Sequence, residues 1–544
     1  MNILVFEQDK AYVQRCLEDG DIDYLEAVSE GAETEFFQYL NSQHILDELA
    51  KSYPLKRKKE EVPLWLYIAS EMSLRLHGMQ SFNGYPLVIR TGGMLNAFGA
   101  EVGRKVVHPE TEQVTIHCPG FNQKNTYDRQ TPCDQDFLRK VARATEAEQL
   151  VGWYNREVPR ILKQKRLFDE EGIFIGDASY VFVPDNENYK GSVVMLFDEH
   201  NHPVNKEELT PAQLRRCRYR RCYKWVELIH TNARHEFFFF VAMHFGSAKA
   251  HECPILYQLV EQFLSMVGKG VMKWLIVDRG LLDGEKFAML KTQWDVDTVS
   301  GLRSDMRILE DARGLLRSGS AAWQEYQPPV QQPLVSPPKP DEGILKRELA
   351  RQRTLRAKGN WPEPKPNEKI VAFGDLTSWD SCPLPLTVIL TEKSGHLPWG
   401  LVTTSQTSDA AGIRDKYHLR ETIEERHRQA KLFWDLSRFH SPNFNLVTNQ
   451  VVFVALTYTL LQVQLMCENI PELNRMTRKR LQHIMLPYGN HIVVYAHNYY
   501  SFFDVPEYTE IVMNIVEPGK SKLLKKVRRI RREFLGSMKN PRGP

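Results

Sequence analysis

Near residue 420, four side chains of different chemistry recur at helical intervals: a phenol, a guanidinium, a carboxylate and an ammonium group. They are Tyr417, Arg420, Glu424 and Lys431. At about 100° per residue, their offsets fall within an arc of roughly 60° on a single helix. Two cations beside a carboxylate suit a phosphodiester backbone together with a metal ion. The alternative is a solvated charged face in a segment rich in charge.

Two short apolar runs far upstream each end in an aspartate. Residues 173–176 precede Asp177, and residues 274–277 precede Asp278. Both runs are typical of buried strands, where a carboxylate is costly to bury unless it is paired or binds a metal. Two aspartates and a glutamate from separate elements can hold two hard cations about 3.5–4 Å apart, and magnesium suits such oxygen ligands best. For either aspartate alone, a capping or turn role is the alternative.

These residues resemble the signature of the DDE transposases of bacterial insertion sequences, specifically the cut-and-paste class with a YREK signature (the insertion sequence four family). In that pattern two, three and six residues separate the tyrosine, arginine, glutamate and lysine, and this chain matches it from Tyr417 to Lys431. An Asp-Arg-Gly sequence after an apolar strand is a second landmark, and it begins here at Asp278. Asp177 stands at the family's first aspartate. The resemblance covers about residues 140 to 470.

The resemblance implies that Asp177, Asp278 and Glu424 form the catalytic and metal-binding triad of an RNase H-like core, a mixed sheet flanked by helices. The core would be interrupted by a strand-containing insertion domain. It implies two Mg²⁺ ions as cofactors, which Mn²⁺ can replace, and no small-molecule cofactor. It also implies double-stranded DNA as the partner, both transposon ends and target, bound by a homodimer in a synaptic complex.

For DNA contact, the resemblance implies that Tyr417, Arg420 and Lys431 hold phosphates near the cut. Trp399, at the start of an apolar strand upstream of the signature, is similar to a family tryptophan that stacks on a base flipped out during a hairpin step. Stacking on an extruded base offsets the cost of unstacking it. The alternative is that Trp399 anchors a local hydrophobic cluster.

Two basic segments are further candidates for DNA contact. The first interleaves arginines with tyrosines between residues 215 and 224, where Arg218, Arg220 and Arg221 can bind phosphates while neighbouring rings stack on bases or sugars. A plain charged loop is the alternative. The second puts eight cations into residues 520–532, with apolar residues at helical spacing. That segment could grip DNA or a partner subunit, and a membrane-surface helix is the alternative.

Length and composition agree with a multidomain nucleic-acid enzyme. The chain has 544 residues, 42% of them hydrophobic, and a net charge of only +3, so any DNA surface must come from local patches. The eight cysteines show no zinc-finger spacing, and no targeting segment is evident. Polar residues interrupt the apolar run 451–466, which favours a buried core helix over a membrane span. We expect a cytoplasmic, nucleoid-associated bacterial protein.

The chain is expected to divide into five segments. The resemblance implies that a helical N-terminal region recognises transposon-end DNA and that two segments form the catalytic core on either side of an insertion domain with proline-rich linkers. A basic, helical region is expected at the end of the chain. In that order the segments are residues 1–140 (N-terminal region), 141–300 (core, first part), 301–410 (insertion), 411–490 (core, second part) and 491–544 (C-terminal region).

Three functions remain open on the sequence alone. The first is a metal-dependent transposase that cuts both transposon ends and joins them to target DNA. The second keeps the same site but makes it a nuclease or resolvase without strand transfer. The third is a transposase-derived, sequence-specific DNA-binding protein that no longer cuts. Because all three acidic positions are present, the sequence favours an enzyme.

Overall fold

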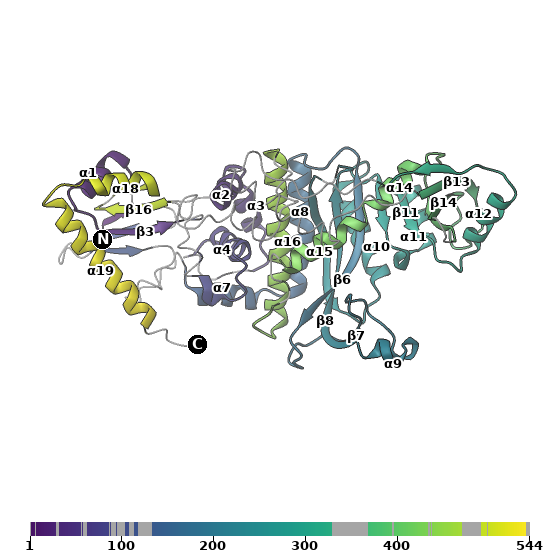
Figure 1. Cartoon of the computed structure of the whole chain (residues 1–544), viewed down its shortest axis with the longest axis horizontal. Coiled ribbons are helices and arrows are strands. Elements are labelled where there is room, and N and C mark those ends of the chain that lie inside the picture. Colours follow the sequence, from purple (N-terminus) through teal and green to yellow (C-terminus); the bar gives the residue numbers. More distant parts are fainter. Residues whose placement is uncertain are drawn as a thin grey trace. The chain divides into compact units, whose positions relative to one another are not determined.

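The structure is a computed structural model of the whole chain (Figure 1). It describes residues 2–85 apart from 6, 29–31, 56 and 58–61, and short pieces between 88 and 117. It also describes residues 133–328 apart from 235, and 368–469 apart from 394–396, 433–435 and 437. The last described part is 491–539 apart from 498. Most of the predicted proline-rich linkers lie outside these residues.

The chain divides into two compact units, each of which is assembled from separate stretches of sequence. One unit combines residues 1–150, 445–457 and 478–544, and the other combines residues 151–444 and 458–477. This division differs from the five consecutive segments expected from the sequence, because both ends of the chain fall in the same unit. All the candidate catalytic residues fall in the second unit.

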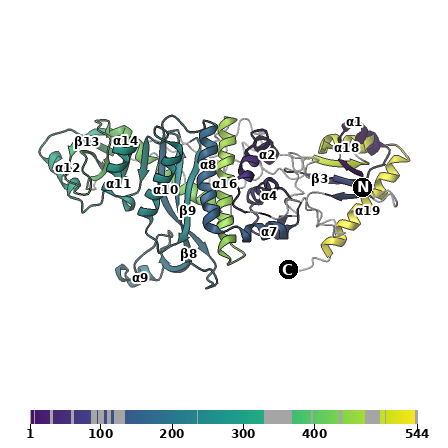
Figure 2. The same ribbon diagram turned by 180° about the vertical axis from the view of Figure 1, so that it is seen from behind.

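The second unit is built on a ten-stranded mixed sheet with helices packed against it, visible from both sides in Figures 1 and 2. Its strands run in the order β12-β13-β14-β15-β11-β10-β6-β8-β7, and β9 also pairs with β8. The strands are β6 (Ile173–Val183), β7 (Val193–Phe197), β8 (Arg218–Thr231), β9 (Phe238–Ser247), β10 (Trp274–Val277), β11 (Asp297–Gly301), β12 (Gln324–Tyr326), β13 (Glu368–Leu376), β14 (Leu386–Lys393) and β15 (Trp399–Thr403).

The middle of this sheet is parallel and both of its flanks are antiparallel. β10 pairs in parallel with β6 on one side and with β11 on the other. β8 is antiparallel to β6, and β15 is antiparallel to β11. Parallel strands need a crossover connection, and here the helix α10 (Glu252–Val267) precedes β10 and packs against β6, β8 and β9.

Three further helices complete the surroundings of the sheet. In α8 (Ala147–Gln164), the Tyr154 hydroxyl donates to the carbonyl of Phe240, and Asn155 exchanges hydrogen bonds with the backbone of Met243, both on β9. α14 (Ala410–His418) packs on β11, β13 and β14. α15 (Glu421–Leu432) packs on β6. The sheet is therefore covered by helices where the two aspartates lie.

The strands of residues 301–410 continue the ten-stranded mixed sheet of the second unit. β15 pairs with β11, β14 with β15, and β13 with β14, so no separate sheet is formed by this segment in the described residues. Two other expectations also differ from the structure. Asp177 lies inside β6 rather than at its end, because β8 keeps pairing with β6 as far as Val183. The arginine-rich run is the first part of β8, since β7 pairs with Arg218–Cys222.

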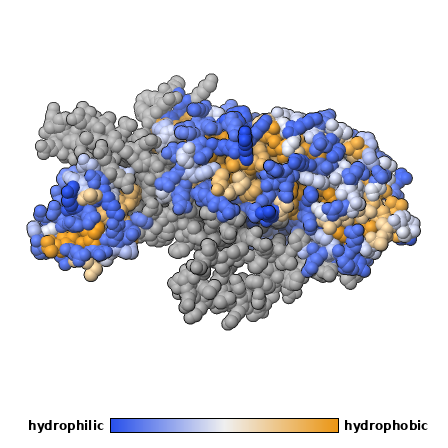
Figure 3. Space-filling model, turned by 90° about the horizontal axis from the view of Figure 1, so that it is seen from above, coloured by the Kyte–Doolittle hydropathy of each residue, from blue (hydrophilic) through white to orange (hydrophobic). Residues whose placement is uncertain are grey.

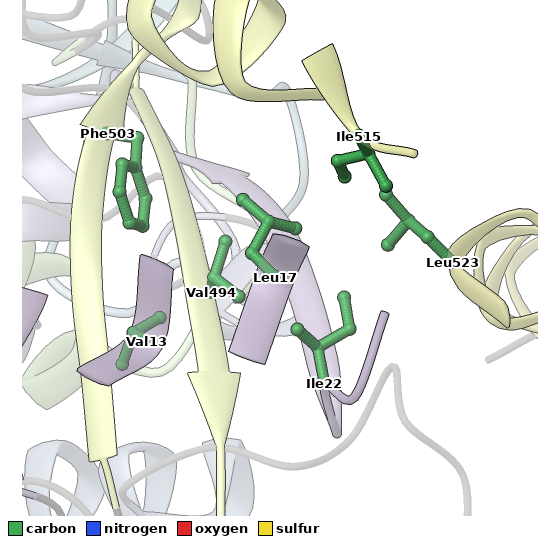
Figure 4. Packing of buried hydrophobic residues seen from close by; sticks show 7 residues of the cluster. All are labelled: Val13, Leu17, Ile22, Val494, Phe503, Ile515 and Leu523. Atoms are coloured by element: carbon green, nitrogen blue, oxygen red, sulfur yellow. The ribbon is translucent and has the colours of Figure 1, made fainter. Parts of the chain in front are cut away.

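The first unit contains a small sheet built from both ends of the chain. β3 (Tyr24–Val28) pairs with β16 (His491–Ala496), which pairs with β17 (Tyr499–Asp504), and β17 pairs with β2 (Glu7–Gln8). The helices α1 (Lys10–Glu18) and α18 (Val505–Asn514) pack against this sheet, and α19 (Gly519–Lys539) packs against α1. Their buried side chains form one cluster (Figure 4), with members Val13, Leu17, Ile22, Val494, Phe503, Ile515 and Leu523. The C-terminal region is therefore not purely helical.

The rest of the described first unit is mainly helical. Its elements are β1 (Asn2–Val5), α2 (Ala32–Ser42), α3 (Ile45–Lys51), α4 (Leu64–Leu76), β4 (Arg104–Val107), β5 (Val114–His117) and α7 (Gln135–Ala144). The helix α16 (Phe444–Cys467) gives residues to both units and is the one described helix long and apolar enough to cross a membrane. Its most apolar stretch is 89% buried inside the protein, as in a core helix. Hydrophilic residues cover much of the described surface seen in Figure 3, with hydrophobic patches among them.

Candidate active site

Asp177, in β6, and Asp278, the residue directly after β10, follow two neighbouring parallel strands to the same level of the sheet. The register pairs Trp274 with Ile173 and continues to Val277 with Gly176, and each aspartate is the next residue along the chain. Paired strands lie about 4.8 Å apart, so this register brings the backbones of the two aspartates close together. The pair expected from two distant apolar runs is thus assembled by the β6–β10 pairing.

The surroundings of Asp177 disfavour its ionised form. Its Oδ1 accepts a hydrogen bond of 2.8 Å from the amide of Ala178. Burial raises the pKa of this carboxyl to about 6, and the nearby Glu227 acts in the same direction, against the opposing effects of His427 and Arg420. A carboxylate that is costly to ionise gains most from a cation, which is the electrostatic pattern of many functional sites.

The spacing of the signature residues predicted a single helix, and this prediction is wrong: they lie on two helices and the turn between them. α14 ends at His418, Leu419 and Arg420 form a turn, and α15 begins at Glu421. The amides of Leu419 and Arg420 bond to carbonyls three residues earlier, at 3.1 Å in both cases, which tightens the backbone at the junction. Tyr417 therefore belongs to α14, Arg420 to the turn, and Glu424 and Lys431 to α15.

Arg420 faces the two aspartates. Its Nη1 lies 3.8 Å from Oδ1 of Asp278, whose side chain is 38% exposed, and its charge also acts on Asp177. Its guanidinium lies 5.7 Å from the ring centre of Tyr417. Tyr417 in turn packs closely on β11, because a Cβ at Gly301 would overlap its hydroxyl oxygen. The structure thus brings Tyr417 and Arg420 close to the C-terminal end of β10, where Asp278 lies.

Glu424 is exposed on α15, the helix that packs on β6. Among the described residues, no group of three or more histidine, cysteine, aspartate or glutamate side chains is placed to hold a metal ion. Asp177 and Asp278 fit a hard divalent cation as adjacent oxygen ligands. The arrangement described does not bring Glu424 into shared coordination with them, so the expected three-carboxylate site is only partly assembled.

Two residues that the sequence did not single out lie beside Asp177. Glu227 on β8 is registered directly opposite Asp177 on β6 and is fully buried. Its Oε1 lies 2.5 Å from Nε2 of His427, which is also buried and follows Glu424 by three residues on α15. One signal could have revealed Glu227: a glutamate within an otherwise apolar strand requires a specific partner.

Lys431 points into this buried cluster. Its Nζ donates a hydrogen bond to the hydroxyl of Ser179 on β6. Burial lowers the pKa of Lys431, while the carboxyl groups of Glu227 and Asp177 act in the opposite direction. The ammonium group expected to face DNA is therefore held against the sheet in this structure.

Trp399 packs within the protein at the start of β15. It is half-buried against a hydrophobic cluster that includes Ile413 and Leu401. The Arg414 guanidinium lies 5.1 Å from its ring centre, and the Tyr417 ring centre lies 6.2 Å away. These contacts are those of the local anchor named as the alternative role for this tryptophan.

The three arginines of the basic segment differ in their surroundings. Arg220 lies 3.4 Å over the ring of Phe182, and Arg221 pairs with Asp185 at 3.2 Å. Arg218 is exposed, and no ion pair or hydrogen bond holds its side chain among the described residues. Two of the three are thus engaged within the protein, which leaves Arg218 the most available for DNA.

One of three comparisons with known proteins gives the family of this chain. A family model described as "Transposase DDE domain" matches residues 189–460, half of the chain. Asp278 and Glu424 lie inside the match, whereas Asp177 precedes its start. No curated protein matches the chain. Among solved structures, the piggyBac transposase synaptic complex with hairpin DNA matches with a TM-score of 0.35 and 10% identity, covering 84% of this chain and 79% of that chain.

Proposed function

The chain belongs to the DDE transposase family, and we propose that it cuts both ends of a transposon and joins the freed 3′ hydroxyls to target DNA. The observation that carries this proposal is the register that sets Asp177 beside Asp278. The adjacent helix α15, which bears Glu424, packs on the same strand as Asp177. We propose that the mixed sheet and its helices are an RNase H-like core.

The chemistry requires divalent cations, and hard oxygen donors favour Mg²⁺, with Mn²⁺ as a substitute. Asp177 and Asp278 would hold the ion, and Glu424 is the carboxylate that would complete the set. Bound cations would activate an attacking oxygen and stabilise the leaving oxygen in each in-line displacement at phosphorus. In the first displacement the attacking group is water, and in the next it is the DNA 3′ hydroxyl.

The other residues at this edge would act on the DNA backbone. Arg420 offers a guanidinium that can donate paired hydrogen bonds to phosphate oxygens. Its closeness to Asp278 would place that phosphate next to the aspartates. Tyr417 would support Arg420 and present its hydroxyl at the same edge. Because cutting two ends requires two sites, we propose a homodimer on double-stranded DNA.

The test is a cleavage and joining assay with purified protein, Mg²⁺ and a labelled duplex that carries the element's own inverted repeats. Wild-type protein should cut at the repeat ends and join them to a second DNA. Asp278→Asn should lower cleavage by at least about a thousandfold, because loss of a ligand removes metal-assisted stabilisation of the transition state. Asp305→Asn, an exposed aspartate nearby in the sequence, should leave the rate unchanged.

Two results would overturn the proposal. Cleavage without any joined product would make the protein a nuclease or a resolvase. Binding to the repeats with no cleavage, in Mg²⁺ and in Mn²⁺, would make it a DNA-binding derivative of a transposase. Binding without cleavage should be excluded first, because Glu424, which would complete the metal ligands, is exposed in this structure.

A further inference from the structure

The last helix of the chain is held in place by residues from the beginning of the chain. Leu523 of α19 is 4% exposed and belongs to the same cluster as Val13 and Leu17 of α1. Figure 4 shows Leu523 pointing toward Ile515 within this cluster. Val527, one turn further along α19, also packs against the cluster. One stripe of α19 is therefore a core face.

A close approach of two backbones sets the position of α19. A Cβ at Gly519, the first residue of α19, would overlap the carbonyl oxygen of Glu18 at the end of α1. A Cβ at Gly20, which has a φ of +69°, would overlap the carbonyl oxygen of Gly519. These two glycines allow the end of α1 and the start of α19 to touch, so the direction of α19 is fixed by the fold.

The remaining circumference of α19 is cationic. Residues 520–532 contain eight lysines and arginines and no acidic residue. Lys526 is half-buried, and the other seven are exposed. Setting Arg529 aside, no ion pair among the described residues neutralises the others. The eight are Lys520, Lys522, Lys525, Lys526, Arg528, Arg529, Arg531 and Arg532.

We propose that the exposed face of α19 binds the phosphates of duplex DNA without regard to sequence. The proposal rests on the proposed function, which makes DNA the substrate. The cations span roughly 18 Å along the helix at 1.5 Å per residue, a length over which a duplex presents about ten phosphates. Like charges at this density repel one another, and an extended polyanion would remove that repulsion while releasing counterions.

The burial of the apolar stripe argues against a membrane as the partner. An interfacial helix inserts its apolar face between lipids, whereas Leu523 and Val527 already pack in the cluster with α1. Some apolar surface does remain nearby, since Met513 is 75% exposed and Leu524 is 47% exposed. The experiment therefore includes a membrane arm.

Distant parts of the sequence hold α19 in place. β16 and β17, which carry the chain into α18 and α19, pair with β3 and β2. The anchored position of α19 therefore depends on residues 7–28 as well as on residues 491–539.

The first measurement is the affinity of the full chain for a random-sequence duplex of 30 base pairs, without metal, over a range of salt concentrations. The variant Arg528→Gln with Arg531→Gln should lower the slope of log affinity against log salt by about 1.8, since each phosphate contact contributes about 0.9. A control with the same charge change, Lys269→Gln with Lys273→Gln in the exposed segment between α10 and β10, should leave the slope unchanged. An unchanged slope in the α19 variant would overturn the proposal.

The second measurement separates an anchored surface from a basic tail. Gly519→Leu keeps all eight cations but displaces α19 from Glu18, so we expect affinity for the duplex to fall by at least about fivefold. Undiminished affinity would show that anchoring is irrelevant. Circular dichroism of both α19 variants checks that the rest of the chain remains folded.

The third measurement offers vesicles of phosphatidylcholine and phosphatidylserine in place of DNA. Sedimentation with these vesicles that is lost in the arginine variant, with duplex affinity unaltered, would overturn the proposal in favour of a membrane. The binding measurements use neither a repeat sequence nor a metal, so a negative result in them does not affect the test of end cleavage. A chain that cuts transposon ends yet shows no role for α19 would refute this inference alone.

Discussion

Glu227 lies directly opposite Asp177 across the β6–β8 pairing, and its Oε1 is 2.5 Å from Nε2 of His427. A fully buried strand carboxylate is thereby linked to α15, the helix that carries Glu424. Burial raises the pKa of Glu227 well above its ordinary value and lowers the pKa of His427 to about 4.

Replacing Glu227 by alanine should destabilise the protein by about 2–4 kcal/mol. The substitution leaves a cavity and deprives His427 and Lys431 of a partner in a buried setting. Urea denaturation measures the change in the free energy of unfolding. Glu325→Ala, an exposed glutamate on the edge strand β12, should change it by less than about 0.5 kcal/mol. Equal effects of the two substitutions would contradict the linkage of Glu227 to α15.

Asp177→Asn should stabilise the metal-free protein, and more so at alkaline pH. The folded-state pKa of about 6 lies above the 3.8 of an unperturbed aspartate, so the favourable protonated form is lost as pH rises through about 6. The folded state then bears the cost of an ionised, partly buried carboxylate. The asparagine variant avoids that cost, which amounts to at most about 3 kcal/mol.

Thermal unfolding in EDTA at pH 5 and pH 8 checks this expectation. The gain in stability from Asp177→Asn at pH 5 should be about half of the gain at pH 8. At pH 5 the aspartate is ionised in the unfolded chain but still mostly protonated in the folded one, so only part of the cost of the raised pKa has been reached. A gain that is the same at both pH values would show that burial does not perturb this carboxyl. Asp305→Asn serves as the exposed comparison.

Lys431→Met should not alter the salt dependence of DNA binding. The Lys431 ammonium donates to Ser179 inside the protein, whereas loss of a phosphate contact would reduce the slope by about 0.9. Affinity for a transposon-end duplex, measured across salt concentrations, tests this directly. A slope reduced by that amount would instead assign Lys431 the phosphate contact that the signature implies.

Arg218→Gln should reduce the same slope by about 0.9, and Arg221→Gln should reduce it less. Arg218 is exposed at the start of β8, while Arg221 is 13% exposed and already pairs with Asp185. Each substitution removes one positive charge. A difference between their slopes therefore shows which arginine side chain is free to contact a phosphate, and does not arise from net charge. Equal reductions would mean that Arg221 exchanges Asp185 for a phosphate when DNA binds.

The sequence by itself determined the elements whose patterns are local. The strand that ends before Asp278 and the long apolar helix α16 are present as predicted. Runs of apolar residues record that a segment is buried, and their length distinguishes a strand from a helix. The family model confirms the DDE transposase domain that the resemblance implied, with Asp278 and Glu424 inside the matched residues. The finer assignment to the class with the YREK signature stays a prediction.

Only the tertiary structure decided which buried segments became neighbours. The β6–β10 register that aligns Asp177 with Asp278, the position of Glu227 across from Asp177, and the pairing of β3 with β16 all join residues far apart in sequence. An apolar pattern shows that a strand needs a partner and does not specify that partner. The turn at Leu419 and Arg420 escaped prediction for a related reason: helical periodicity continues across it, while packing of α14 on β11 and of α15 on β6 bends the backbone.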